Sequence, residues 1–199
     1  MSLLREIQEN IIDADSELSS SLLKLRLLAS RLGSGPLEQW VKHETEGYPR
    51  DAEVPDYRKI GVTYRGSWSG PYGSGISDAP IPSYLIEKYG GKSWTEYEVR
   101  QSIAGVDHLL RGQSDENSAI VIDASNLILL LQGKVYGDYS CISVTGRLSS
   151  TALRELQYAV RSRTLELTIE IERAIPAAAD VSLGKPKASD AGSGETVTQ

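Results

Sequence analysis

The sequence predicts an α+β domain in which long helices flank a small central β region. Apolar residues recur at spacings of three and four near both ends of the chain, which is typical of amphipathic helices. Between residues 57 and 68 the apolar residues alternate with a period of two, as in a strand. The chain has 199 residues, with 10 Tyr, 3 Trp and no Phe, enough for one domain with a sizeable core.

The N-terminal segment predicts one long helix that ends at Gly33, a residue that readily adopts the left-handed conformation. We expect a bend at Ser19–Ser21, because serine competes for backbone hydrogen bonds. A second helix begins at Pro36 and ends by Gly47, since Pro49 cannot continue it. The apolar face of the first helix contains Leu4, Ile7, Ile11, Ala14, Leu18, Leu22, Leu25, Ala29 and Leu32.

The central region begins with a strand over residues 57–68, in which Ile60, Val62 and Tyr64 alternate with small or polar residues. From Gly70 to Pro82 the sequence is so rich in glycine and proline that it predicts an irregular loop of about a dozen residues. Loops of that length within a compact domain are often functional. This central loop is therefore the first place to look for a site.

Weaker signals follow the loop. We expect a helix from about Trp94 to Gly112, a turn at 114–117, and strands at 119–122 and 139–144. The apolar segment 126–132 has no period that distinguishes a short helix from a strand.

The final helix is predicted to begin at Ser149 or Ser150 and to end at Pro176. Neither terminal helix would be stable alone in water, so we expect the two to pack together. Residues 1–176 then form one domain, and the small polar residues of 177–199 predict a disordered tail. The apolar stripe of this helix contains Leu153, Leu156, Val160, Thr164, Leu167, Ile171 and Ala174.

Composition argues against several classes of protein. A net charge of −6 is unfavourable for nonspecific nucleic-acid binding, and the second helix has more glutamates than lysines, unlike a DNA-recognition helix. One cysteine, Cys141, excludes an intramolecular disulfide framework and favours a reducing compartment. The longest apolar run, Leu127–Leu131, is too short to span a bilayer. We expect a cytoplasmic protein that binds neither nucleic acid nor membrane.

A series of short motifs carries a family resemblance. They are LASRLG at 28–33, Trp40, EGYP at 46–49, PDYR at 55–58, SGPYGSG at 69–75 and APIP at 79–82. In this order they resemble the AbiTii domain family, over about residues 3–172. The resemblance implies a role in bacterial defence against bacteriophages, within an abortive-infection or toxin–antitoxin-like operon. It implies no catalytic residue.

The glycine-rich string is the first candidate site. Its glycines permit positive φ angles and close approach of backbone N–H groups to a phosphate or a partner. It lacks the Gly-Lys-Ser/Thr ending of a Walker A loop, and Trp68 stands where a nucleophile elbow has serine. The alternative is a rigid surface connector packed by its tyrosine and prolines. The candidate residues are Gly70, Pro71, Tyr72, Gly73, Ser74 and Gly75.

Asp56, Tyr57 and Arg58 form a second candidate at the start of the predicted strand. An ion pair between Asp56 and Arg58 would order the glycine-rich loop, whereas a turn capped by Asp56 is the simpler interpretation. The two histidines, His43 and His108, have acidic neighbours that point elsewhere on a helix, so no catalytic dyad is expected. No ligand spacing supports a metal, and we expect no cofactor.

A third candidate is a face of the final helix, where Arg154, Tyr158 and Arg161 recur at i, i+4 and i+7. They would bind an anion or a partner, unless this is a solvated face with exposed ion pairs. Without a catalytic constellation, we expect a noncatalytic interaction or regulatory module whose long helices bind a protein partner or a second copy. The alternative is a small effector toxin that acts on nucleic acid or nucleotides through the glycine-rich loop with Asp56 and Arg58.

Overall fold

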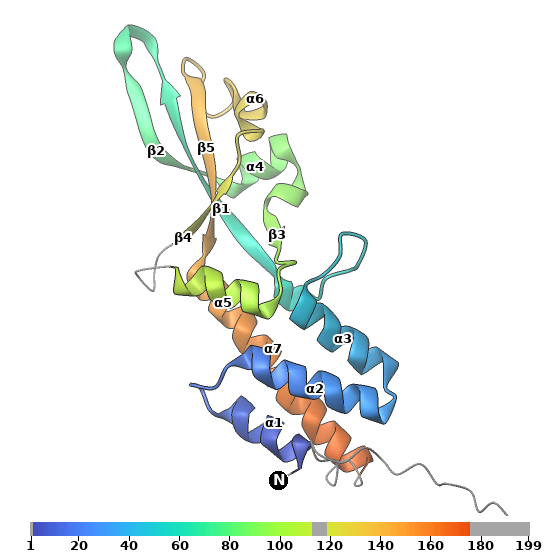
Figure 1. Ribbon diagram of the computed structural model, residues 1–199. Coiled ribbons are helices and arrows are strands. Elements are labelled where there is room, and N and C mark those ends of the chain that lie inside the picture. The colour runs from blue at the N-terminus through green and yellow to red at the C-terminus, as the bar shows by residue number, and fades with distance from the viewer. Residues whose placement is uncertain (1, 113–118, 176–199) are drawn as a thin grey trace, which may run out of the picture.

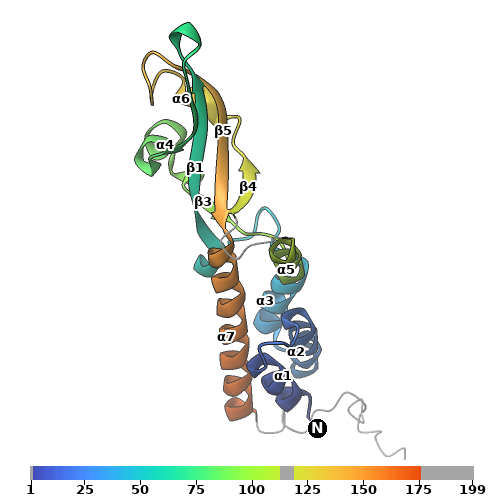
Figure 2. The same ribbon diagram turned by 90° about the vertical axis from the view of Figure 1, so that its left-hand side faces the viewer.

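The computed structural model describes residues 2–112 and 119–175 and shows an elongated molecule made of a helical base and a β head (Figures 1 and 2). The α+β class expected from the sequence is confirmed. The helical base consists of α1 (Leu3–Ile12), α2 (Leu18–Leu32), α3 (Gly35–Glu46), α5 (Ile103–Arg111) and α7 (Ser150–Ala174). The β head consists of β1 (Lys59–Ser69), β2 (Gly75–Ile81), β3 (Glu96–Glu98), β4 (Ala119–Asp123), β5 (Ser140–Ser149), α4 (Ser83–Gly90) and α6 (Leu127–Leu131).

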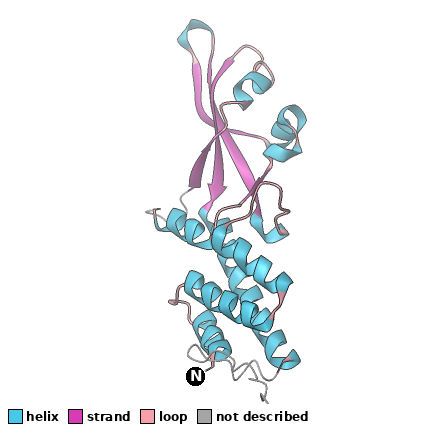
Figure 3. Cartoon of the chain, turned by 45° about the vertical axis from the view of Figure 1, so that its right-hand side comes forward, coloured by secondary structure: helices cyan, strands magenta, loops and turns pink. Residues whose placement is uncertain are grey.

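An antiparallel sheet forms the β head, with the strand order β2-β1-β5-β4 and with β3 paired to the first residues of β1. Alternate residues of β1 are buried, as the period of two predicted, and Val62, Tyr64 and Trp68 lie on the buried side. The α6 helix packs against β5, and α4 packs against α6 (Figure 3). Residues 56–58, at the start of the expected strand, form a short 3₁₀ turn, η1, instead.

In the helical base, α7 packs along α1 and also contacts α2, so the expected packing of the terminal helices is confirmed (Figure 2). Leu25 of α2 and Leu156 and Val160 of α7 are almost completely buried in one core that extends into the β head. Leu167 and Ile171 are only partly buried, because the buried face of α7 continues through Thr164 and Thr168, which are completely buried. The cap of α7 is Ser149, whose hydroxyl accepts a hydrogen bond from the N–H of Ala152 at 3.4 Å.

The single long N-terminal helix that we expected is interrupted, because α1 ends at Ile12 and α2 begins at Leu18. Asp13 causes the break: its carboxylate accepts hydrogen bonds from the N–H of Asp15 at 3.1 Å and from the hydroxyl of Ser16 at 2.8 Å. Such local bonds compete with the helix. The serines where we expected a bend lie inside α2.

The segment Gly70–Pro82 is not an irregular loop, which corrects the expectation. Residues 71–73 form a 3₁₀ turn, η2, and Gly75–Ile81 form β2, which pairs with β1 as a hairpin. Pro80 is compatible with this strand because β2 lies at the edge of the sheet. A bulge in β1 between Gly66 and Trp68 shifts the register of the hairpin. The glycines and prolines of this segment therefore led to the prediction of a loop where the chain forms an edge strand.

The expected helix over 94–112 is much shorter, since α5 begins only at Ile103. Ser102 caps it by accepting a hydrogen bond from the N–H of Gly105 at 3.1 Å. The residues before it form a 3₁₀ turn, η3 (Lys92–Trp94), and then β3, whose pairing with β1 outweighs the helical pattern. The α4 helix was not expected at all.

The other elements predicted after the glycine-rich segment agree with the structure, as far as it describes them. The strand expected at 119–122 is β4, the strand expected at 139–144 extends to Ser149 as β5, and the ambiguous apolar segment is the helix α6. The expected turn at 114–117 and tail at 177–199 lie outside the described residues.

Candidate functional site

A buried ion pair between Glu44 of α3 and Arg58 of η1 joins the helical base to the β head. Both side chains have 0% of their surface exposed. Glu44 Oε1 accepts hydrogen bonds from Arg58 Nε at 3.2 Å and from the hydroxyls of Tyr48 at 2.7 Å and Tyr57 at 2.8 Å, and Oε2 accepts from Arg58 Nη2. Trp40 Nε1 donates to the Tyr57 hydroxyl at 2.9 Å. This network satisfies a charge that would otherwise be costly to bury.

Arg58 also binds the segment between β3 and α5. Its Nη1 donates to the carbonyl oxygens of Val99 at 2.8 Å and Gln101 at 2.7 Å, and its guanidinium carbon lies 4.8 Å from the centre of the Tyr48 ring. The guanidinium is therefore occupied by protein groups. The pair between Asp56 and Arg58 that we considered does not form, because Asp56 is exposed and binds Lys59 at 2.8 Å.

Of the residues in this network, Tyr57 and Arg58 were expected from the sequence as site residues, whereas Glu44, Tyr48 and Trp40 were not. The sequence does contain a sign that Glu44 is buried, since Glu44 follows Leu37 and Val41 at helical spacing on the apolar face of α3. A carboxylate on such a face indicates a buried charge that needs a cation.

We expect the free energy of unfolding to fall as the pH rises from 10 towards 12. Burial, together with the charge of Glu44, raises the pKa of Tyr57 to about 12 and raises the pKa of Tyr48 as well. Below pH 10 both tyrosines keep their protons in either state; above it the unfolded chain loses protons first, which favours unfolding. Urea unfolding across this range should show a smaller fall for Tyr57→Phe than for the wild type; equal falls would contradict this assignment.

The third candidate face lies beside a groove of about 560 Å³ between α2, α5 and α7. The guanidinium of Arg161 binds backbone carbonyl oxygens. Its Nη1 donates to the carbonyls of Asn10 at 3.3 Å, Ile11 at 2.9 Å and Asp13 at 2.9 Å. Its Nη2 donates to the carbonyl of Ser16 at 2.9 Å. It thus satisfies carbonyls left free at the end of α1.

The other two members of that face, Arg154 and Tyr158, are exposed on the same groove. The pair of Arg163 and Glu166, at 3.3 Å, agrees with the solvated alternative for neighbouring positions on α7.

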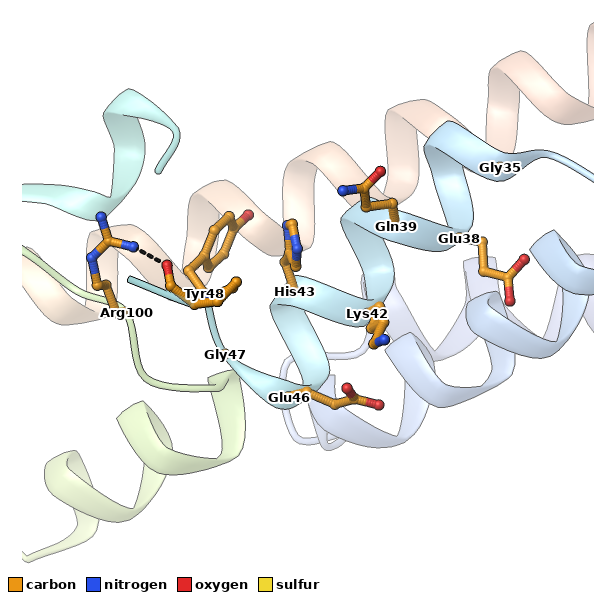
Figure 4. Close-up of a pocket in the computed structure, with 10 residues that line it drawn as sticks. Gly35, Glu38, Gln39, Lys42, His43, Glu46, Gly47, Tyr48 and Arg100 are labelled. Carbon is orange, nitrogen blue, oxygen red and sulfur yellow. Dashed lines mark hydrogen bonds between the residues drawn. The ribbon is translucent and has the colours of Figure 1, made fainter. Parts of the chain in front are cut away.

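A second hollow, of about 730 Å³, lies along the solvent side of α3 (Figure 4). His43 and Tyr48 contact each other there, with ring centroids 4.8 Å apart. Arg100 is held by the carbonyls of Pro49 and Ala52. Glu46 is held by Arg26 at 2.6 Å. Arg100 and Glu46 are therefore held by neighbouring groups, whereas Glu38, Lys42 and His43 line the rest of the hollow.

The glycine-rich string forms the tip of the β1–β2 hairpin. The N–H of Gly70 donates to the carbonyl of Ser74 at 2.8 Å, and the N–H and hydroxyl of Ser74 donate to the carbonyl of Pro71 at 3.1 and 2.7 Å. Tyr72 has a φ of 56° and Gly73 a φ of 77°, so the turn contains two successive left-handed residues. The Tyr72 side chain is fully exposed.

Other exposed apolar residues lie near this tip, in a region that we call the distal end (residues 70–74 and 127–142; Figure 1). Tyr139 adjoins the turn: its hydroxyl lies 3.5 Å from Ser74 Oγ, and its ring leaves no space for a Cβ at Gly70. Leu129 and Leu130 of α6 and Ile142 of β5 are exposed by 85%, 44% and 59%. The distal end is the candidate functional site, because Tyr72 and these exposed apolar side chains come from segments at the same end of the β head.

Within residues 2–112 and 119–175, no cluster of histidine, cysteine and acidic side chains is arranged to hold a metal ion. No helix in the same part of the chain combines the length and the hydropathy needed to cross a bilayer.

Comparison with known proteins defines the class to which this α+β fold belongs. The AbiTii family model matches residues 2–193, nearly the whole chain. The chain therefore belongs to the AbiTii family, as its motifs indicated, and the family name denotes abortive infection, a bacterial defence against phages. Neither the curated proteins nor the solved structures contain a match to the chain.

Proposed function

We propose that the chain is a noncatalytic interaction module of an abortive-infection system and that its distal end binds a protein partner. The observation that carries this proposal is Tyr72, a large aromatic residue that is fully exposed and held in the left-handed conformation. That conformation costs a non-glycine residue about 1–2 kcal/mol. Strain of this kind is concentrated at functional sites, and an exposed ring at a fixed turn is a typical anchor for a partner.

The alternative of a nucleotide-acting toxin has less support at the tip. A phosphate needs free N–H donors and cations, but the N–H groups of Gly70 and Ser74 bond within the turn. The segment 70–75 also contains no lysine or arginine.

The terminal helices, where we expected a partner to bind, bury much of their apolar stripes in the core of the helical base. This burial favours the distal end over those helices as the partner-binding surface.

Tyr72→Ala should weaken partner binding by about 30-fold, the loss expected for an aromatic hot spot worth about 2 kcal/mol, and should remove protection against phage. The measurement is the efficiency of phage plating on bacteria that carry the complete defence locus. Tyr84→Ala is the matched control, because Tyr84 is an exposed tyrosine on α4, away from the turn. If Tyr72→Ala protects as well as the wild type, the distal end is the wrong site.

A further inference from the structure

The β4 strand forms an open edge of the sheet. It pairs with β5 through the five consecutive residues Ala119–Asp123, and no other described strand pairs with it (Figure 2). Within the described part of the chain, residues 119–123 form no backbone hydrogen bond outside this pairing. Alternate residues of an antiparallel strand turn their N–H and C=O groups away from the neighbouring strand. The free side of β4 therefore presents unpaired backbone donors and acceptors, which only another extended chain can satisfy in register.

The other strands at the margins of the sheet carry features that prevent further pairing. Pro80 of β2 lacks an N–H, and the pairing of β2 with β1 shifts register beside Asp78, which has a φ of 45°. The β3 strand has only three residues and contains Glu96 and Glu98. In β4 the first four residues are aliphatic, and no proline, register shift or charge occurs before Asp123. Because sheets usually protect their edges in these ways, the unprotected β4 indicates a partner strand.

The side chains of β4 lie alternately on the two faces of the sheet. Ile120, which is opposite the buried Leu148, and Ile122 pack against the core but are only partly buried. Val121 lies on the other face, and its side chain is 62% exposed. Another strand at this edge would therefore cover aliphatic surface on both faces of the sheet.

The sequence of β4 is complementary to itself in the antiparallel direction. When Val121 lies opposite the Val121 of a second copy, all five residues pair, and each Ile120 lies opposite an Ile122. Asp123 then lies opposite Ala119, so the two aspartates are about 13 Å apart along the strands. Aliphatic cross-strand pairs are favourable, and no like charges face each other in this register. These pairs favour a second copy of the chain as the occupant of the edge.

We propose that the chain forms a homodimer in which β4 pairs antiparallel with β4 of a second copy about a two-fold axis at Val121. Main-chain hydrogen bonds between the two strands satisfy both free edges and join the two sheets into one. Each copy contributes the same surface, as a two-fold dimer requires. The interface does not include Tyr72, and it does not depend on the function proposed for the distal end.

Sedimentation velocity of the full chain over a series of concentrations is the first test. We expect a reversible dimer with twice the mass of one chain. The backbone amides of residues 119–123 should exchange with deuterium more slowly as the dimer forms, because the pairing protects them. A chain that stays monomeric up to about 1 mM overturns the proposal, since its β4 edge would then accept only a strand from another protein.

Two charge variants test the pairing at Val121. Val121→Glu and Val121→Lys each place like charges opposite each other across the two-fold axis, and each should raise the dissociation constant about tenfold. An equimolar mixture of the two variants should restore the dimer, because glutamate then faces lysine. Far-UV circular dichroism should be unchanged, since the Val121 side chain is exposed. If the mixture associates as weakly as each variant alone, the pairing at Val121 is wrong and the proposal fails.

Leu23→Glu is the matched control for these variants. The Leu23 side chain is 58% exposed, close to the value for Val121, but it lies on α2 in the helical base. The dimer should persist when Leu23 is replaced. If Leu23→Glu dissociates the dimer and Val121→Glu does not, the two copies meet through their helices, which contradicts pairing at the β4 edge.

Discussion

Replacing Glu44 with glutamine is expected to lower the free energy of unfolding by about 3–5 kcal/mol, the usual cost of leaving one member of a buried ion pair without its partner. The substitution preserves the volume of the side chain but removes the charge that compensates Arg58, which is completely buried. Arg58→Met should cost a similar amount, since Glu44 would then be a buried carboxylate supported only by tyrosine hydroxyls. Chemical denaturation measures both changes.

The coupling between these two residues identifies the pair as the cause. Glu44→Gln with Arg58→Met should cost clearly less than the sum of the two single substitutions, because no uncompensated charge remains. Glu166→Gln is the control: it breaks the exposed pair with Arg163 and should change stability by less than about 1 kcal/mol. Additive costs at Glu44 and Arg58 would show that the two side chains contribute separately.

Leu25→Ala is expected to cost about 2–5 kcal/mol, because Leu25 is completely buried where α2 meets the rest of the core and the truncation leaves a cavity. Leu167→Ala should cost less, because the Leu167 side chain is only partly buried. Thermal or urea unfolding compares the two variants directly. A loss below about half a kcal/mol at Leu25 would contradict the assignment of α2 to the core.

The helices and strands with a clear apolar period were predictable, because the spacing of apolar residues indicates which face is buried. The stripes of α2 and α7 and the alternation of β1 each place apolar side chains on the face that the fold buries. Where local chemistry competes with periodicity, prediction from sequence fails. Asp13 interrupts the first helix through two side-chain hydrogen bonds, and β3 is a strand because β1 offers it a partner.

The candidate site was predictable only in part. The glycine-rich string marked the hairpin tip, but the exposed Leu129 and Ile142 come from distant segments that only the folded chain brings to the same end. Arg58 is a candidate from the sequence because a pair with Asp56 would order the glycine-rich loop. In the structure its partner is Glu44, 14 residues earlier in the chain. Arg161 was chosen from helical spacing, and its ligands are backbone carbonyls that no side-chain pattern reveals.

The partner-binding role of the distal end is tested most directly by Gly73→Val. Gly73 has a φ of 77° and open space where a Cβ would lie, so valine reshapes the turn through backbone strain alone. Gly61→Val is the matched control, because Gly61 also has open space but lies within β1 without a positive φ. Far-UV circular dichroism should be unchanged for both variants.

The decisive measurement is phage plating on bacteria whose complete defence locus carries each variant. We predict that Gly73→Val loses protection and that Gly61→Val keeps it. Wild-type protection by a folded Gly73→Val variant would contradict the account, since the hairpin tip would then be only a connector between two strands.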